Sequence, residues 1–197
     1  MRGMDDGSGA QNGLRRGLVE PAHRGDERIT LVGFLGRQRD LVAWKLAGAT
    51  AEVLGTVSTP TGMTALGVVQ HLTVVERSWL RSVFSGEDLP PTEPASDWRV
   101  APGTTTEQVL AGYAAEAARC DAVVAAAPSL DAVAARAPMS LRWILLHLVE
   151  ETARHVGHLD LLREQADGAT GEDPEDPDDK DHPDDSDQPS DPDEPHG

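Results

Sequence analysis

The stretch of sequence that decides the fold is residues 141–163, LRWILLHLVEETARHVGHLDLLR. Apolar side chains recur along it at helical spacing, namely Leu141, Ile144, Leu145, Leu148, Leu159 and Leu162. Such a stripe is typical of a long amphipathic helix that buries one face in a core. Ser140 precedes the stripe and Gly168 follows it, so we expect a helix from Leu141 to about Ala166 with Ser140 as its N-cap.

The same apolar spacing predicts three earlier helices, over residues 28–46, 64–84 and 104–127. Asp26 is the expected N-cap of the first helix, and Thr104 with Glu107 is the expected capping box of the third. No alternating strand pattern interrupts these segments. We therefore predict an all-α protein, a four-helix bundle with long inter-helix connections that permit crossovers.

Charge is distributed unevenly along the chain. The whole sequence has a formal charge of −17, and residues 171–197 hold thirteen Asp and Glu side chains against the single base Lys180. Residues 168–197 also contain six prolines and almost nothing apolar, so we expect a disordered acidic tail. Residues 1–25 show no sustained periodicity and are expected to form a disordered leader. The predicted bundle then spans residues 26–167.

Composition excludes several classes of function. A chain this acidic is unsuited to nucleic acid, because phosphate contacts need clustered Lys and Arg. No apolar run approaches the length that a membrane span needs, and no secretory signal is visible. The single cysteine, Cys120, rules out an intramolecular disulfide, and its place among small apolar residues predicts a core role. We expect a cytoplasmic protein, whether monomer or homodimer.

Two positions on the buried stripe of the last helix are polar. Glu151 and His155 lie four residues apart, so their side chains leave the same face of the helix one turn from each other. A carboxylate on a core-facing stripe is costly unless a cation or a hydrogen-bond donor pairs with it. The two residues can satisfy each other as a structural pair. His71, on the flank of the apolar stripe predicted over residues 64–84, favours a second hypothesis, a metal site.

Two histidines and one carboxylate are the ligand set of many catalytic zinc sites, which keep one position open for water or substrate. The same set serves non-haem iron, so the ligands alone do not name the metal. His147 and His158 are alternative ligands or supporting donors, and Asp160 is a candidate to orient His158 or His71. A solvated position is the competing interpretation for Asp160.

The patterns QHLTVVERSW at residues 70–79 and SLRWILLHLVEETARHVGHLDLLRE at residues 140–164 resemble the DinB-like metal-binding four-helix bundles. More narrowly, the chain is similar to the branch that contains mycothiol-dependent maleylpyruvate isomerases and mycothiol transferases. The resemblance covers residues 26–170. It implies that His71, Glu151 and His155 hold a divalent metal, with Zn²⁺ expected first and Ni²⁺ or Fe²⁺ as alternatives.

The resemblance also implies thiol chemistry. The metal would activate a low-molecular-weight thiol, expected to be mycothiol, for attack on a small electrophile, with S-conjugation or isomerisation as the outcome. Arg77 and Arg154, and less directly Arg81, are candidates to hold a carboxylate of the thiol or substrate, although surface salt bridges are the competing interpretation. Trp79 and Trp143 are candidates to line the pocket.

Two other functions remain open at this point. The first is a metal-assisted hydrolase, in which a metal-bound water attacks and Glu150 acts as the base. The second is a non-catalytic, metal-binding stress-response protein, in which His147 or His158 closes the fourth ligand position. A hydrolase would not require a thiol, whereas a transferase would. A metal held by four protein ligands would indicate the non-catalytic protein.

Overall fold

The computed structural model describes residues 18–90 and 98–170 of the chain. Residues 1–17, 91–97 and 171–197 lie outside the described residues, and with them most of the predicted leader and nearly all of the predicted acidic tail. The described residues form helices and no strand, which confirms the predicted all-α class. An isolated bridge pairs Val133 with Ser140 in the loop before the last helix.

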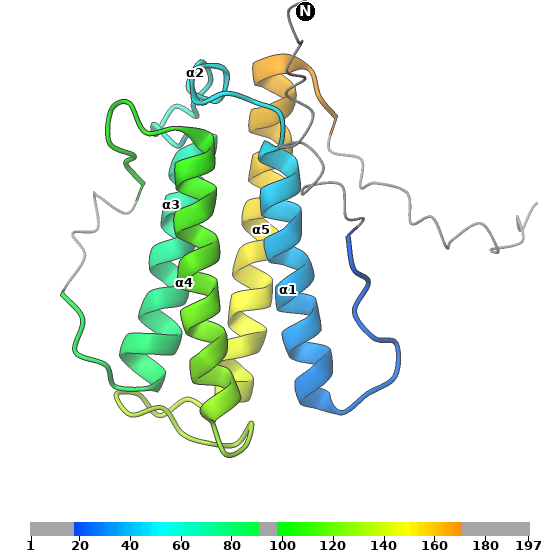
Figure 1. The fold of residues 1–197 in the computed structure, drawn as a ribbon, viewed down its shortest axis with the longest axis vertical. Coiled ribbons are helices and arrows are strands. Elements are labelled where there is room, and N and C mark those ends of the chain that lie inside the picture. Colours follow the sequence, from blue (N-terminus) through cyan, green and yellow to red (C-terminus); the bar gives the residue numbers. More distant parts are fainter. Residues whose placement is uncertain (1–17, 91–97, 171–197) are drawn as a thin grey trace, which may run out of the picture.

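Long helical segments lie side by side (Figure 1). They are α1 (Glu27–Leu46), α3 (Ala65–Glu76) continued by η2 (Arg77–Phe84), α4 (Thr106–Ala126) and α5 (Leu141–Asp167). α1 packs mainly against α5, and α3 packs mainly against α4. In Figure 1, α4 and α1 lie in front of α3 and α5. None of the described helices is both long enough and apolar enough to cross a membrane.

Polar side chains cap the first turns of the helices, where they accept hydrogen bonds from free backbone N–H groups. Asp26 caps α1 and Ser140 caps α5, as the sequence predicts. The capping box of α4 is displaced by one residue from the prediction, because it is formed by Thr105 and Gln108. The hydroxyl of Thr104 instead donates to the carbonyl of Ala101 at 2.8 Å and closes a turn before the helix.

Two helical features were not predicted. The short helix α2 (Ala51–Leu54) begins after Thr50 and is a single turn, too short to produce a periodic apolar pattern. The segment predicted as one α-helix over residues 64–84 becomes π-helical at Arg77. A π turn adds about one residue to each turn, and apolar spacing over only two turns does not distinguish it from an α turn.

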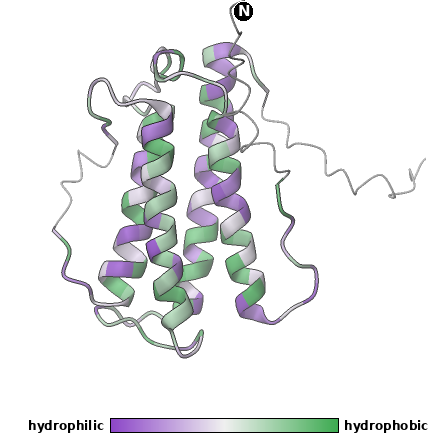
Figure 2. Ribbon diagram, viewed as in Figure 1, coloured by the Kyte–Doolittle hydropathy of each residue, from purple (hydrophilic) through white to green (hydrophobic). Residues whose placement is uncertain are grey.

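The core forms two clusters, and α5 contributes to both. Its N-terminal half packs into one cluster through Leu141, Ile144, Leu145 and Leu148. Its C-terminal half packs into the other through Val156, Leu159 and Leu162. Each long helix accordingly carries hydrophobic and hydrophilic faces (Figure 2). Residues 150–155 of α5 lie between the residues that pack into the two clusters, and the candidate ligands of this helix fall in that interval.

Residues that precede the predicted domain boundary at residue 26 already pack against the helices. Leu18 packs against the core cluster, and Pro21 is buried. A Cβ added at Gly33 would lie 3.3 Å from the Cβ of Pro21, so Gly33 leaves room for this segment on α1. Glu20 forms an ion pair with Arg37 at 2.6 Å.

Candidate metal centre

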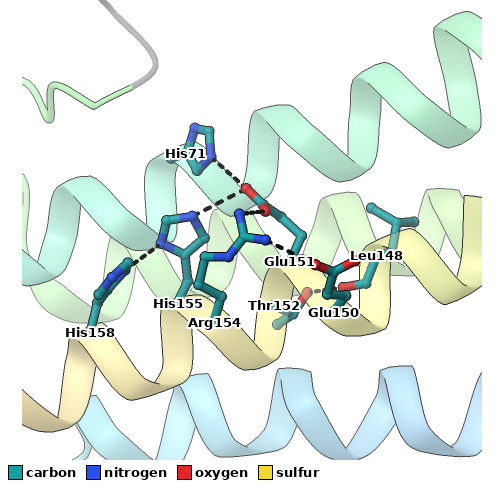
Figure 3. A network of polar contacts seen from close by, with 8 residues as sticks. All are labelled: His71, Leu148, Glu150, Glu151, Thr152, Arg154, His155 and His158. Carbon is teal, nitrogen blue, oxygen red and sulfur yellow. Dashed lines mark hydrogen bonds and ion pairs between the residues drawn. The ribbon is translucent and has the colours of Figure 1, made fainter.

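His71 on α3 and Glu151 and His155 on α5 converge on one point between the two helices (Figure 3). Nε2 of His71 lies 3.4 Å from Oε1 of Glu151, and Nε2 of His155 lies 3.2 Å from the same oxygen. One ligand atom from each residue lies within 4.8 Å of the other two. The structure therefore brings together all three residues that the sequence singled out.

Buried neighbours on α5 fix the helix that carries Glu151 and His155. Leu148, one turn before Glu151 on α5, and Val156, directly after His155, are buried in the two core clusters. Thr152 lies between the two α5 ligands, and its hydroxyl donates to the carbonyl of Leu148 at 2.7 Å, so it does not compete for Glu151. His155 is 5% exposed, which leaves its ring shielded from bulk water.

These donors fit a divalent metal ion. Two donors bound to a tetrahedral zinc at about 2.0–2.1 Å lie about 3.3 Å apart. The separations of the two imidazole nitrogens from Oε1 of Glu151, 3.4 and 3.2 Å, are close to that value. Hydrogen bonds have similar lengths, so the chemistry of the set matters as well. Two imidazoles and a carboxylate leave one tetrahedral position for another ligand.

The charges in the cluster follow from competing effects. Burial raises the pKa of Glu151, but hydrogen bonds from His71 and His155 and the charges of His155 and Arg154 outweigh it, so the pKa lies below its ordinary value. Burial lowers the pKa of His155, and the nearby Glu151 only partly offsets this. At neutral pH Glu151 is thus ionised and His155 neutral, the states in which both residues bind metals.

Outer partners orient two of the three side chains. Arg154 donates to Oε2 of Glu151 at 3.0 Å and leaves Oε1 facing the imidazoles. A second nitrogen of Arg154 bonds to Glu150, also at 3.0 Å, and Glu150 is exposed. Nδ1 of His158 lies 3.2 Å from Nδ1 of His155, so one ring donates to the other. With Nε2 of His155 facing the cluster, His158 fixes the opposite edge of its ring.

Trp98 is a residue of the site that sequence reasoning did not place there. Its ring stacks on His71 with centroids 3.9 Å apart and an interplanar angle of 11°. Gly67 permits this approach, because a Cβ at that position would lie 2.5 Å from the carbonyl oxygen of Trp98. The available signals were an aromatic residue in a proline-rich connection and a glycine inside a predicted helix.

Other candidates of the sequence analysis lie outside the cluster. The ring of His147 contacts Trp143, with centroids 5.2 Å apart, and Trp79, with centroids 4.9 Å apart. His147 is therefore neither among the converging ligands nor hydrogen-bonded to them. Asp160 does not orient His158 or His71, since it forms an ion pair with Lys45 at 2.8 Å.

The predicted anion-binding arginines have different surroundings. Arg154 lies at the cluster, but its nitrogens are engaged by Glu150 and Glu151. Arg81 pairs with Glu87 and Glu116, away from the cluster. The pKa of Glu87 is lowered chiefly by its hydrogen bond from Arg81, and the charge of Arg77 adds to this effect.

Cys120 is buried in the core, as predicted. Burial, and then the charges of Glu76 and Glu116, raise the pKa of its thiol to about 12. Thiolates rather than thiols act as nucleophiles, so this cysteine is not activated.

Comparison with known protein families identifies one match for the domain that carries this cluster. The family model described as mycothiol-S-transferase matches residues 30–168, which include all three converging residues and Trp98. No curated protein matches the chain.

Proposed function

Because the chain belongs to the mycothiol-S-transferase family, we propose that it joins mycothiol to a small electrophile in a metal-dependent reaction. The convergence of His71, Glu151 and His155 on one point is the observation that carries the proposal. The proposed scaffold is the four-helix bundle expected from the sequence.

In this proposal the ligand atoms are Nε2 of His71, Nε2 of His155 and Oε1 of Glu151. Zn²⁺ is the metal we expect first, since three protein ligands with one position left open are typical of catalytic zinc. A divalent metal in this site supplies a positive charge that lowers the pKa of a thiol from about 8.5, so that the thiolate forms at neutral pH. The described residues contain no competing thiolate, because Cys120 is buried and protonated.

The transfer itself needs no further redox partner. The thiol releases its proton to solvent, its sulfur forms a bond to the electrophilic carbon, and the bond from that carbon to the leaving group breaks. The residues of the chain hold the reactants and the charge. Arg154 keeps Glu151 ionised and oriented, His158 fixes the ring of His155, and Trp98 supports the ring of His71.

The surroundings of Glu150 and His147 favour a transferase over the two alternatives. Glu150 is exposed and engaged by Arg154, which disfavours it as the base of a hydrolase. His147 packs between two tryptophans, which disfavours it as a fourth ligand that closes the site.

Metal content and thiol transfer test the proposal together. Elemental analysis of the chelator-free, untagged chain should find about one zinc per chain, and the purified protein should conjugate mycothiol to a fluorogenic alkyl halide. His71→Ala should lose both metal and activity. His147→Ala is the matched control, a half-buried histidine one turn from Glu151, and it should keep its metal.

The outcomes separate the possible functions. If iron or nickel were found in place of zinc, the proposed ligand set would stand and only the identity of the metal would change. Metal in the parent with hydrolysis but no thiol requirement would favour the hydrolase. No metal in the parent, even after zinc is offered, would reject the proposal and leave Glu151 and the two histidines as a structural cluster.

A further inference from the structure

A cavity of about 1120 Å³ lies next to the candidate metal centre. It is bounded by α2, by the first residues of α3 and by the segment 98–107 that leads into α4. Trp98 belongs to its lining and also stacks on His71, so one side chain separates the cavity from the converging ligands. Sites for small molecules have volumes of about 300–1,000 Å³, so this space accommodates a ligand of several rings.

Threonine hydroxyls are a distinctive feature of the lining. Thr50, Thr64 and Thr105 are the N-caps of α2, α3 and α4, and all three line the cavity. Each hydroxyl oxygen accepts a backbone N–H, at 3.3, 3.1 and 3.2 Å respectively. A hydroxyl that accepts one hydrogen bond still has its own proton to donate. The caps Thr50 and Thr64 therefore present hydrogen-bond donors at the cavity wall, whereas the hydroxyl of Thr105 donates to Glu107.

The charged groups of the lining are mixed in sign. Arg99 can donate hydrogen bonds, whereas Glu52 and Glu107 can accept them. The two carboxylates disfavour an anionic ligand, and Arg99 disfavours a cationic one. Hydroxyl groups both donate and accept, so a neutral polyhydroxylated ligand matches this lining, and Trp98 offers an apolar surface for its C–H groups.

We propose that this cavity binds the sulfur-free, polyhydroxylated part of the thiol substrate. The inference rests on the proposed function, in which the sulfur lies at His71, Glu151 and His155. Mycothiol joins an N-acetylcysteine, which carries the sulfur, to an amino sugar and an inositol. The cavity would hold the sugar and the inositol, while Trp98 lies between them and the metal ligands.

A sulfur-free probe tests the cavity without any need for catalysis. Calorimetric titration with the N-acetylglucosaminyl-inositol glycoside, in which the sugar nitrogen is an uncharged amide as it is in mycothiol, should show binding to the full-length chain. Ala101→Trp places an indole in the cavity at an exposed position, and it should weaken the affinity at least tenfold. Ala115→Trp, at an exposed position of α4 outside the described cavities, is the matched control and should bind like the parent.

A second variant covers the case in which Ala101→Trp folds poorly, as judged by its thermal midpoint. Arg99→Ala removes an exposed cavity donor without adding bulk, and it should weaken glycoside binding several-fold. Absence of binding to the parent at millimolar probe, or equal affinity of the parent and the cavity variants, would overturn the inference.

Kinetics distinguish failure of this inference from failure of the proposed function. In Ala101→Trp, the ratio of kcat/KM for mycothiol to kcat/KM for N-acetylcysteine should fall at least tenfold relative to the parent. An unchanged ratio in an active enzyme would overturn the cavity assignment and leave the transferase standing. A parent that binds the glycoside but conjugates no thiol would reject the transferase while the cavity assignment holds.

Discussion

Two carboxylates, Glu76 and Glu151, are withdrawn from water on neighbouring helices, and their partners differ in kind. Glu76 is 1% exposed and accepts two hydrogen bonds from Arg39, at 3.0 and 2.6 Å, and one from Tyr113 at 3.0 Å. Glu151 is half-buried and faces the imidazoles of His71 and His155 with one oxygen and Arg154 with the other.

The difference lies in the lone pairs. Arginine has no acceptor atom and stays charged, so the partners of Glu76 are donors and its cluster is electrostatically complete. Each ring nitrogen of His71 and His155 that faces Glu151 can present a lone pair to a cation, according to its tautomer, so the cluster around Glu151 brings together several groups that can bind a metal ion. Such a cluster can bind an added cation. The Glu76 cluster already contains a cation, the guanidinium of Arg39. Burial of a carboxylate alone does not indicate a functional site.

The largest expected effect is on metal binding. Glu151→Gln should abolish stoichiometric metal binding, because an amide oxygen carries no charge to balance the cation, and should change the stability of the metal-free chain by only about 1 kcal/mol. Elemental analysis and urea denaturation in chelator measure the two quantities. A Glu151→Gln chain that keeps one metal per chain would contradict the proposed ligand set.

The opposite pattern is expected at Glu76. Glu76→Gln should lower the free energy of unfolding by about 3–5 kcal/mol, because it leaves the buried guanidinium of Arg39 with Asp121 as its remaining carboxylate. Its metal content should match that of the parent. Denaturant unfolding and elemental analysis check this prediction, and a loss of metal with little loss of stability would reverse the distinction between the two clusters.

The support of His71 by Trp98 can be disturbed at Gly67, which lies one turn before His71 on α3. Gly67→Ala should cost about 1–3 kcal/mol and shift Trp98 away from His71, since the added Cβ would meet the carbonyl oxygen of Trp98 at 2.5 Å. Gly112→Ala is the control, because nothing lies within 4 Å of its Cβ. It should stabilise α4 by about 0.5–1 kcal/mol.

Tryptophan fluorescence and thermal unfolding compare these two glycine variants. If Gly67→Ala were as stable as Gly112→Ala, with an unchanged emission spectrum, the close approach of Trp98 to α3 would not hold in solution.

A further effect concerns Cys120, whose pKa is raised in part by the charge of Glu76. Its pKa rises from 9.0 to about 12 in the folded chain, so the folded state keeps a proton that the unfolded state loses above pH 9. The difference in free energy of unfolding between the parent and Cys120→Ala should therefore keep its full value below pH 9 and shrink as the pH rises toward 12. Urea denaturation of both chains at pH 8 and pH 10.5 measures this, and a constant difference would contradict the buried thiol.

Part of the candidate site was predictable because helical spacing is a local property. Glu151 and His155 lie four residues apart on a strongly periodic segment, so their common face followed from the sequence. The meeting of His71 with them needed the further assumption that residues 64–84 and 141–166 pack together, and the resemblance to a known family supported that assumption.

Features that depend on one residue or on one tertiary contact could not be predicted from the sequence. The box at Thr105 and Gln108 was assigned one residue too early, because adjacent threonines compete for the same cap. For Asp160 a solvated position was favoured over a role in orienting a histidine, and its actual partner, Lys45, lies on α1, more than a hundred positions earlier in the chain.

By itself the sequence determined the helical class, the helix ends at Asp26 and Ser140, and the common face of Glu151 and His155, because these follow from spacing and capping over a few residues. Only the tertiary structure decided that Trp98 packs on His71 and that Glu76 is paired with Arg39. Those contacts join segments that lie far apart in the sequence. Their geometry depends on the packing of several helices at once, which no local pattern predicts.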